Sequence, residues 1–141
     1  NSSGNRARRI HPRRWRSCST YRLDGVTVCA SVADVLRARA ALAEVRVADE
    51  IKRYMVDLVS ATRSAPSVLL GASPRASLAL MKLAQALAAF DGLSYVTPDH
   101  VQEIAVEAIA HRLVLDAQRR FAGDSAEQVV RDVLARTPAP A

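Results

Sequence analysis

The sequence is poor in the residues that build disulfide frameworks, zinc sites and membrane spans. It has two cysteines, Cys18 and Cys29, with no CxxC pair and no histidine pair close to either. This arrangement argues against a zinc site and a disulfide framework, so we expect unpaired, reduced thiols. No stretch reaches the roughly 18 to 20 apolar residues of a membrane span, and no apolar segment follows the N-terminal arginines as in a secretory signal. We therefore expect a cytoplasmic protein.

Sequence motifs for catalysis are also missing. The chain has no GxxxxGK(S/T) phosphate loop, no GxGxxG fingerprint, no HExxH pair and no GxSxG nucleophile elbow. His100 and His111 would lie three turns apart on one helix, which is too far for them to share a metal ion. We interpret each as a surface or packing histidine. The sequence therefore predicts no metal site, and no catalysis by this chain alone.

The positive charge is concentrated at the N-terminus. Residues 1–22 contain seven arginines and no acidic residue, whereas the rest of the chain has 13 basic and 14 acidic residues, so the formal charge of +6 comes from this arm. A basic arm on a nearly neutral body presents no shaped positive surface to phosphates. The arm has no apolar period, which predicts disorder. Among the 20 basic residues only Lys52 and Lys82 are lysines, a bias typical of a G+C-rich bacterial genome.

Helical periodicity begins at Ser31, where Ser31 and Asp34 resemble a capping box. A second helix is predicted to open on Asp49 and Glu50 and to close near Arg63, because acids at the start and a base at the end suit the helix dipole. The side chains expected on the buried sides are Val32, Val35, Leu36 and Leu42 in the first helix and Ile51, Tyr54, Met55, Leu58 and Thr62 in the second.

The most apolar helix is predicted between Pro74 and about Phe90. Ser73 is the expected N-cap, Pro74 the first helical residue, and Gly92 the residue that ends the helix. Apolar residues occur nearly all round this helix, including Leu80 and Leu83, which is typical of a helix at the centre of a bundle.

The polar strip of this helix is narrow and contains two cations. Arg75, Lys82 and Gln85 lie seven and three residues apart, so they share one face. A cation in a first turn is disfavoured by roughly 0.3 to 1 kcal/mol, because the exposed N–H groups there carry partial positive charge. Arg75 is therefore either a plain exposed arginine or a group that helps the helix N-terminus to hold a phosphate supplied from elsewhere.

Two further helices are predicted beyond Gly92. Thr97 followed by Pro98 opens one of them, and Ser125 with Gln128 caps the last. The β-prone pieces between helices, which could form a small ribbon at most, are residues 45–47, 93–96 and 112–115. The expected fold class is an all-α bundle of about five helices. We expect a disordered arm at 1–22, one helical domain at 23–136 and a flexible tail at 137–141.

Several separate blocks of sequence share the pattern of one family. The blocks are residues 47–80, which include "GASPRA", then "DGLSYVTPDHVQEIA" at 91–105, "AHRLVL" at 110–115 and "SAEQVVRDVLARTPAP" at 125–140. Together they make the stretch from Ser31 to Ala135 resemble the C-terminal lid domain of MoxR-type AAA+ ATPases. The resemblance implies that Arg75 is the sensor-2 arginine, which reaches the γ-phosphate of ATP, with weaker support for Ser73 and Lys82 as contributors. Gly92 and Leu93 stand where the family commonly has Gly-Arg.

The resemblance also implies what surrounds such a lid. The nucleotide-binding core, with its phosphate loop, magnesium-binding acids and arginine finger, is not in this sequence, and residues 1–22 look like a non-native leader. ATP and magnesium would therefore bind the parent protein, and no tight binding to this fragment is expected. The implied partners are the missing AAA+ core, neighbouring subunits of a homo-oligomeric ring and a client protein of unknown identity. The implied activity of the parent is ATP hydrolysis in a chaperone-like remodelling or cofactor-insertion machine.

Two other functions stay open at the sequence level. One is a nucleic-acid-binding helical protein, because "RARRIHPRRWR" at 6–16 offers arginines for phosphates and Trp15 for stacking on a base. The arm alone would bind nucleic acid weakly and without sequence preference. The other is a protein-interaction scaffold without a role in ATP hydrolysis.

Overall fold

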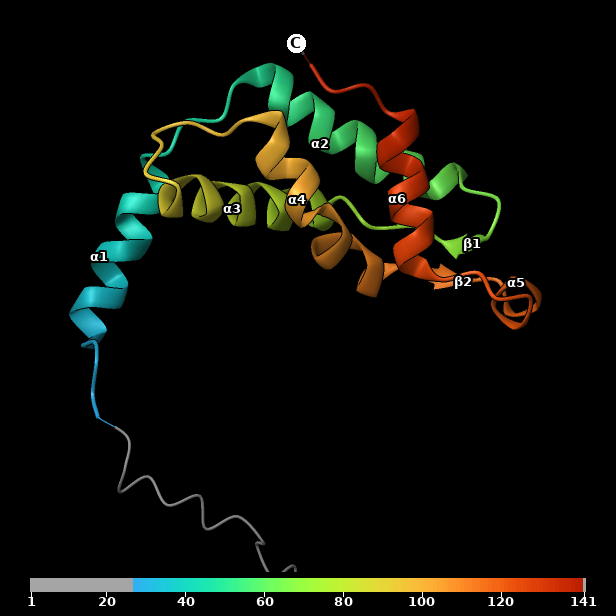
Figure 1. Ribbon diagram of the computed structural model, residues 1–141, viewed down its shortest axis with the longest axis horizontal. Coiled ribbons are helices and arrows are strands. Elements are labelled where there is room, and N and C mark those ends of the chain that lie inside the picture. Colours follow the sequence, from blue (N-terminus) through green and yellow to red (C-terminus); the bar gives the residue numbers. More distant parts are fainter. Residues whose placement is uncertain (1–26, 141) are drawn as a thin grey trace, which may run out of the picture. The chain divides into compact units, whose positions relative to one another are not determined.

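The computed structural model describes residues 27–140, which divide into two units between Ser31 and Val32. The described part of the first unit, residues 27–31, has no regular structure. The second unit is mostly helical (Figure 1), which confirms the predicted fold class. Its elements are α1 (Val32–Ala43), α2 (Asp49–Ala61), η2 (Thr62–Ser64), β1 (Val68–Leu70), α3 (Arg75–Phe90), α4 (Pro98–Ile109), η3 (Ala110–Arg112), β2 (Val114–Leu115), α5 (Ala117–Phe121) and α6 (Ala126–Arg136).

Helices α3 and α4 form the centre of the core. α3 buries a stripe of small side chains with Leu80, spaced by four residues along the helix, and this stripe is 0% exposed. Small residues at a helix contact allow a short interaxial distance. α2 and α6 pack against this pair and complete the core. The fully buried residues of α3 are Ala76, Leu80, Ala84 and Ala88, and the buried ones of α4 include Val101, Ala105, Ala108 and Ile109.

The predicted local signals for α2, α4 and α6 are confirmed. α2 begins at Asp49, and all five side chains expected on its buried side, including Thr62 just after it, are buried. α4 begins at Pro98, where the Thr97 hydroxyl accepts a hydrogen bond from the His100 N–H. α6 begins after Ser125, whose hydroxyl accepts from the Gln128 N–H at 3.1 Å.

The small ribbon has one predicted strand and one that was missed. β2 lies in the β-prone piece 112–115 and pairs antiparallel with β1, with Val68 opposite Leu115. β1 (Val68–Leu70) is not among the predicted β-prone pieces. The other two β-prone pieces meet at a single parallel bridge between Arg46 and Tyr95. Helix α5, which is only five residues long, was also not predicted.

The prediction that α1 buries its apolar side is wrong. Val32 is 78% exposed, Val35 54% and Leu36 57%, whereas Leu42 is half-buried. The C-terminal end of α1 lies beside α3, and the rest of the helix extends away from it (Figure 1). Only the C-terminal end of α1 therefore packs against α3, and the apolar side chains nearer its start are exposed in the described part of the chain.

The prediction that α3 lies at the centre of the bundle is confirmed, but its apolar residues are not all buried. One stripe of the helix is buried, whereas Leu78 is 57% exposed, Leu83 45% and Phe90 89%. α3 ends at Phe90 as expected, and Gly92 follows with a φ of 74°, a left-handed conformation that favours glycine.

Candidate functional site

Arg75 is the first residue of α3. Pro74 is the N-cap, with φ −55° and ψ −23°, and no side chain caps the helix. Ser73 is therefore not the side-chain N-cap that the sequence predicted. Pro74 already has helical backbone angles, so the first turn is closed by backbone bonds, with the Ala76 N–H donating to the Ser73 carbonyl at 2.8 Å. The start of α3 carries no acidic side chain in its first turn.

Arg75 lies on an exposed face of α3 that is both cationic and apolar. We call the exposed charged and large apolar residues of this face the α3 outer face. Within residues 27–140 the side chains of Arg75 and Lys82 have no hydrogen bond or ion pair. The α3 outer face consists of Arg75, Leu78, Lys82, Leu83 and Phe90.

The predicted polar strip is divided by the structure. Arg75 and Lys82 are exposed, but Gln85 is half-buried and its Nε2 donates to the Val45 carbonyl at 2.8 Å. Gln85 therefore ties α3 to the end of α1 and has a structural role. Only the two cations of the strip face outward.

The chain before α3 is fixed by two residues that follow α2. The Thr62 hydroxyl accepts from the Ala72 N–H at 3.1 Å and donates to the Val59 carbonyl at 2.6 Å. The Arg63 Nε–H donates to the Ala72 carbonyl at 3.1 Å. Both backbone groups of Ala72, which is 0% exposed, are thus bonded three residues before Arg75. We call this arrangement the Ala72 clamp, and it holds the start of α3 against the end of α2.

The Ala72 clamp requires glycine at position 71. A Cβ atom on Gly71 would lie 2.7 Å from the Arg63 Cα and 2.9 Å from its backbone nitrogen, and non-bonded atoms do not approach that closely. From the sequence, Arg63 was predicted only as the end of a helix and Gly71 only as part of the family block 47–80. The clamp was missed because its bonds join positions nine and ten residues apart across a loop, where periodicity gives no signal.

The two described histidines have structural partners. His100 is 6% exposed, and its Nδ1 accepts from the Thr97 N–H at 3.0 Å, so Nε2 carries the proton and donates to the Asp91 carboxylate at 3.1 Å. His111 is exposed, and its Nδ1–H donates to the Glu107 carbonyl at 2.9 Å. No group of three or more His, Cys, Asp or Glu residues within residues 27–140 could hold a metal ion.

Two carboxyl groups at other helix starts have perturbed pKa values. The Lys52 ammonium, which hydrogen-bonds to Asp49, lowers the pKa of that carboxyl below its ordinary value of 3.8. Hydrogen bonds from its own backbone N–H and from Ser125 lower the pKa of Glu127 below 4.5. The Asp49 shift comes from its pair with Lys52 one turn along α2, and the Glu127 shift comes from hydrogen bonds at the start of α6, so neither marks a reactive site.

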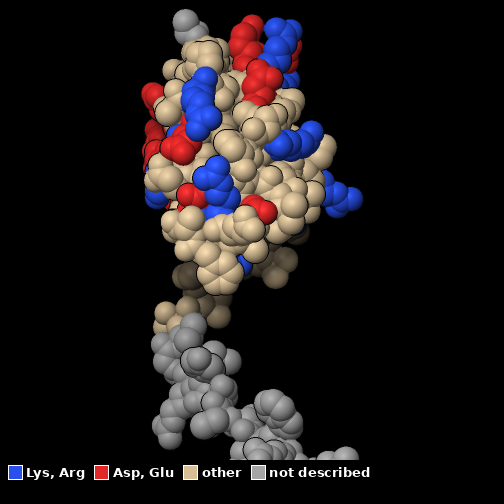
Figure 2. Space-filling view, turned by 90° about the vertical axis from the view of Figure 1, so that its right-hand side faces the viewer, with Lys and Arg blue, Asp and Glu red and all other residues tan. Residues whose placement is uncertain are grey.

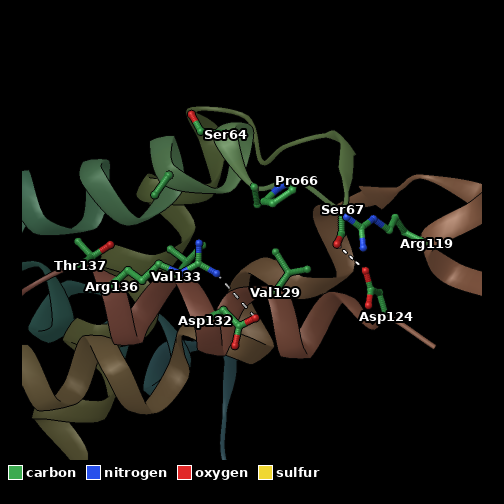
Figure 3. Close-up of a pocket in the computed structure, with 12 residues that line it drawn as sticks. Ser64, Pro66, Ser67, Arg119, Asp124, Val129, Asp132, Val133, Arg136 and Thr137 are labelled. Atoms are coloured by element: carbon green, nitrogen blue, oxygen red, sulfur yellow. Dashed lines mark hydrogen bonds and ion pairs between the residues drawn. The ribbon is translucent and has the colours of Figure 1, made fainter. Parts of the chain in front are cut away.

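A cavity of about 510 Å³ lies between α6 and the segment that follows α2 (Figure 3). Its charged groups are balanced, because Asp124 accepts from the Ser67 hydroxyl beside Arg119, and Asp132 lies 3.9 Å from Arg136. Figure 2 shows the right-hand side of the view in Figure 1, and there acidic and basic side chains are interspersed with uncharged surface. None of the residues that line the cavity belongs to the start of α3.

Comparison with known proteins identifies the family of this chain. The AAA lid domain family matches residues 60–133, which include the Ala72 clamp, Arg75 and most of the α3–α4 core. This chain belongs to the AAA lid domain family. The resemblance of the lid to that of MoxR-type AAA+ ATPases, drawn from its sequence blocks, is confirmed by the relatives it matches.

Two curated relatives and one solved structure resemble the lid. It is 45% identical over 96 residues to the uncharacterized protein YeaC of Bacillus subtilis (strain 168). The aligned stretch covers 68% of this chain and 30% of that protein. It is 34% identical over 119 residues to the chaperone MoxR1 of Mycobacterium tuberculosis, covering 78% of this chain and 32% of that protein. A crystal structure of a candidate ATPase from Cytophaga hutchinsonii superposes with a TM-score of 0.74 at 30% identity, over 77% of this chain and 36% of that one.

The lid spans about a third of the length of these relatives. No helix within residues 27–140 is long and apolar enough to cross a membrane. The predicted basic arm at 1–22 and Cys18 lie outside the described residues, and Cys29 is an exposed free cysteine.

Proposed function

We propose that this lid closes over ATP bound to an α/β ATPase core, with Arg75 as the residue that contacts the γ-phosphate. The observation that carries the proposal is the α3 outer face, where Arg75 lies exposed and unpaired beside three large apolar side chains that no described element covers. Membership of the AAA lid domain family supports it.

The apolar part of the α3 outer face gives the lid a reason to dock. Leu78, Leu83 and Phe90 are each between 45% and 89% exposed. Burial of apolar surface contributes roughly 25 cal/mol per Å², so covering these side chains favours closure. Because Arg75 and Lys82 lie on the same face, docking would bring both cations to the partner surface. The exposed apolar residues of α1 would extend the docking surface.

Arg75 is suited to a phosphate in both chemistry and position. A guanidinium presents a planar fork of donors that matches phosphate oxygens, and the N–H groups of a helix start add partial positive charge. ATP bound to the core would supply the phosphoryl group and, with magnesium held there, the reacting centre. Arg75 would stabilise the charge that develops on the γ-phosphate oxygens during transfer. Lys82 lies two turns away and would attract the nucleotide rather than contact the reacting atoms.

The Ala72 clamp would determine how accurately Arg75 is placed. Both backbone groups of Ala72 are bonded to residues that follow α2, and these bonds would make the start of α3 move together with α2. Catalytic groups lose effectiveness when they are displaced by about 1 Å. The clamp would therefore keep Arg75 in a fixed position relative to α2 when the lid moves.

The parent would hydrolyse ATP as a homo-oligomeric ring that remodels client proteins. MoxR1, to which the lid is 34% identical, is described as a chaperone, and this description favours remodelling or cofactor insertion as the purpose of hydrolysis. ATP and magnesium would bind the core together with Arg75. We propose no tight binding of nucleotide by the lid alone.

The proposal is tested by changing the α3 outer face in a complete ATPase that contains this lid. Leu78→Ser with Leu83→Ser should leave the isolated lid folded but lower ATP turnover by roughly 10-fold or more, because closure loses its apolar contact. Val56→Ser is the matched control, since Val56 is 51% exposed on α2. An enzyme that keeps its full turnover with both leucines replaced would contradict the proposal.

A further inference from the structure

Two arginines other than Arg75 line a cavity that has no part in the proposed sensor-2 role. Arg63 at η2 and Arg112 at η3 line a cavity of about 440 Å³ together with residues 69–73. No acidic residue lines this cavity, and neither arginine has an ion pair within residues 27–140. This contrasts with the cavity of Figure 3, where Arg119 and Arg136 lie beside Asp124 and Asp132.

The two arginines are held by bonds that leave their donor ends free. The Arg63 Nε–H donates to the Ala72 carbonyl at 3.1 Å, and the Arg112 Nε–H donates to the Ala108 carbonyl at 3.0 Å. Each bond uses the inner nitrogen of the guanidinium, so the two terminal nitrogens of each group have no partner in the described part of the chain. An oriented guanidinium loses less side-chain entropy when it binds an oxyanion.

Close packing of Gly71 against Arg63 fixes one wall of the cavity. Gly71 lies against Arg63 so closely that a Cβ atom would be 2.6 Å from the Arg63 Cγ. The absence of a side chain at Gly71 thus keeps the backbone and the Arg63 stem in contact. Leu69 and Leu70, which are 72% and 63% exposed, form an apolar border to the same cavity.

We propose that Arg63 and Arg112 form a second anion site that binds a phosphate group. Two uncompensated guanidinium forks at one cavity are best neutralised by a doubly charged ligand, which favours phosphate over a single carboxylate. The phosphate could come from a nucleotide or from a free phosphate or pyrophosphate. The site goes beyond the proposed function, because it does not include Arg75 and does not require an ATPase core.

The site is tested by titrating the 141-residue chain with inorganic pyrophosphate and following the Nε–Hε signals of its arginines by NMR. The signals of Arg63 and Arg112 should shift together, with one dissociation constant on the order of 1 mM. Arg112→Gln should weaken binding roughly 3- to 10-fold, whereas Arg131→Gln, an exposed arginine on α6, should change it less than about 2-fold. Arg112 is the better variant because its bond lies at the end of its own helix, outside the Ala72 clamp.

Three results would overturn the proposal. One is a shift confined to the arginines of residues 1–22, which would show only non-specific binding by the arm. Another is an unchanged dissociation constant for Arg112→Gln in a chain that melts at the wild-type temperature. The third is succinate binding as tightly as pyrophosphate, which would exclude selectivity for phosphate.

The source of the phosphate is separated by a parallel titration with ATP. Tighter binding of ATP with shifts of the Leu69 and Leu70 methyl signals would identify a nucleotide, and equal affinity without methyl shifts would identify free phosphate. Arg75→Gln should leave both titrations unchanged. This separates the second anion site from the proposed sensor role, because either one can fail without the other.

Discussion

Replacing two leucines of the same helix tests the arrangement of the core. Leu80 is 0% exposed in the centre of α3, and Leu83, one turn further, is 45% exposed. Leu80→Ala removes a fully enclosed side chain and should cost about 2 to 5 kcal/mol of unfolding free energy. Leu83→Ala loses only part of the roughly 1.5 to 3 kcal/mol that full burial of a leucine contributes, and leaves no enclosed cavity, so it should cost about 1 kcal/mol or less.

The assay is urea unfolding of the isolated chain followed by circular dichroism. With a slope of about 1 to 3 kcal/mol per M, Leu80→Ala should lower the midpoint by about 0.7 to 5 M and Leu83→Ala by less than about 1 M. Leu80→Met keeps the volume and should cost less than about 1.5 kcal/mol, so it remains measurable if the alanine variant does not fold. Equal midpoints for the two alanine variants, or a larger loss at Leu83, would refute the assignment of the buried stripe.

The remaining predictions concern the start of α3 and the helix caps. Gly71→Ala should destabilise the chain by about 1 to 3 kcal/mol, because the new Cβ would collide with the Arg63 backbone. Ser73→Ala should change thermal stability by less than about 0.5 kcal/mol, because the Ser73 side chain does not cap the helix. Stability should fall with acid below about pH 4, because the lowered pKa values of Asp49 and Glu127 keep both groups charged in the folded state after the unfolded chain protonates. Asp49→Asn with Glu127→Gln should flatten this acid limb in urea midpoints measured from pH 5 to 3, and an unchanged limb would exclude these carboxylates as its cause.

The parts of the fold set by local signals could be predicted from the sequence. The helix starts at Asp49, Pro98 and Ser125–Ala126 follow from caps and acidic first turns, and the end of α3 follows from Gly92. These signals depend on neighbours within four residues. A pattern of that range can be read from one chain without knowing what packs against it.

The parts that depend on distant contacts could not be predicted. β1 pairs with a strand more than 40 residues away, so its three residues carried no recognisable signal. The apolar sides of α1 and α3 were read as core because periodicity cannot tell whether the covering surface lies in the same chain. Arg75 was predicted as a site residue from its position in a first turn and its family pattern, whereas Arg63 and Arg112 are proposed only from the cavity they share.

The role of Arg75 is tested most directly by measuring single-turnover ATP hydrolysis in a complete ATPase that contains this lid, with the stability of the isolated lid measured in parallel. Arg75→Ala should slow hydrolysis by roughly 10- to 1000-fold and leave the midpoint of unfolding nearly unchanged, because an exposed arginine in a first turn contributes little to stability. Arg75→Lys should restore part of the rate, since it keeps the charge but loses the fork. Hydrolysis at the parental rate with Arg75→Ala, or a lid that unfolds with it, would contradict the sensor role.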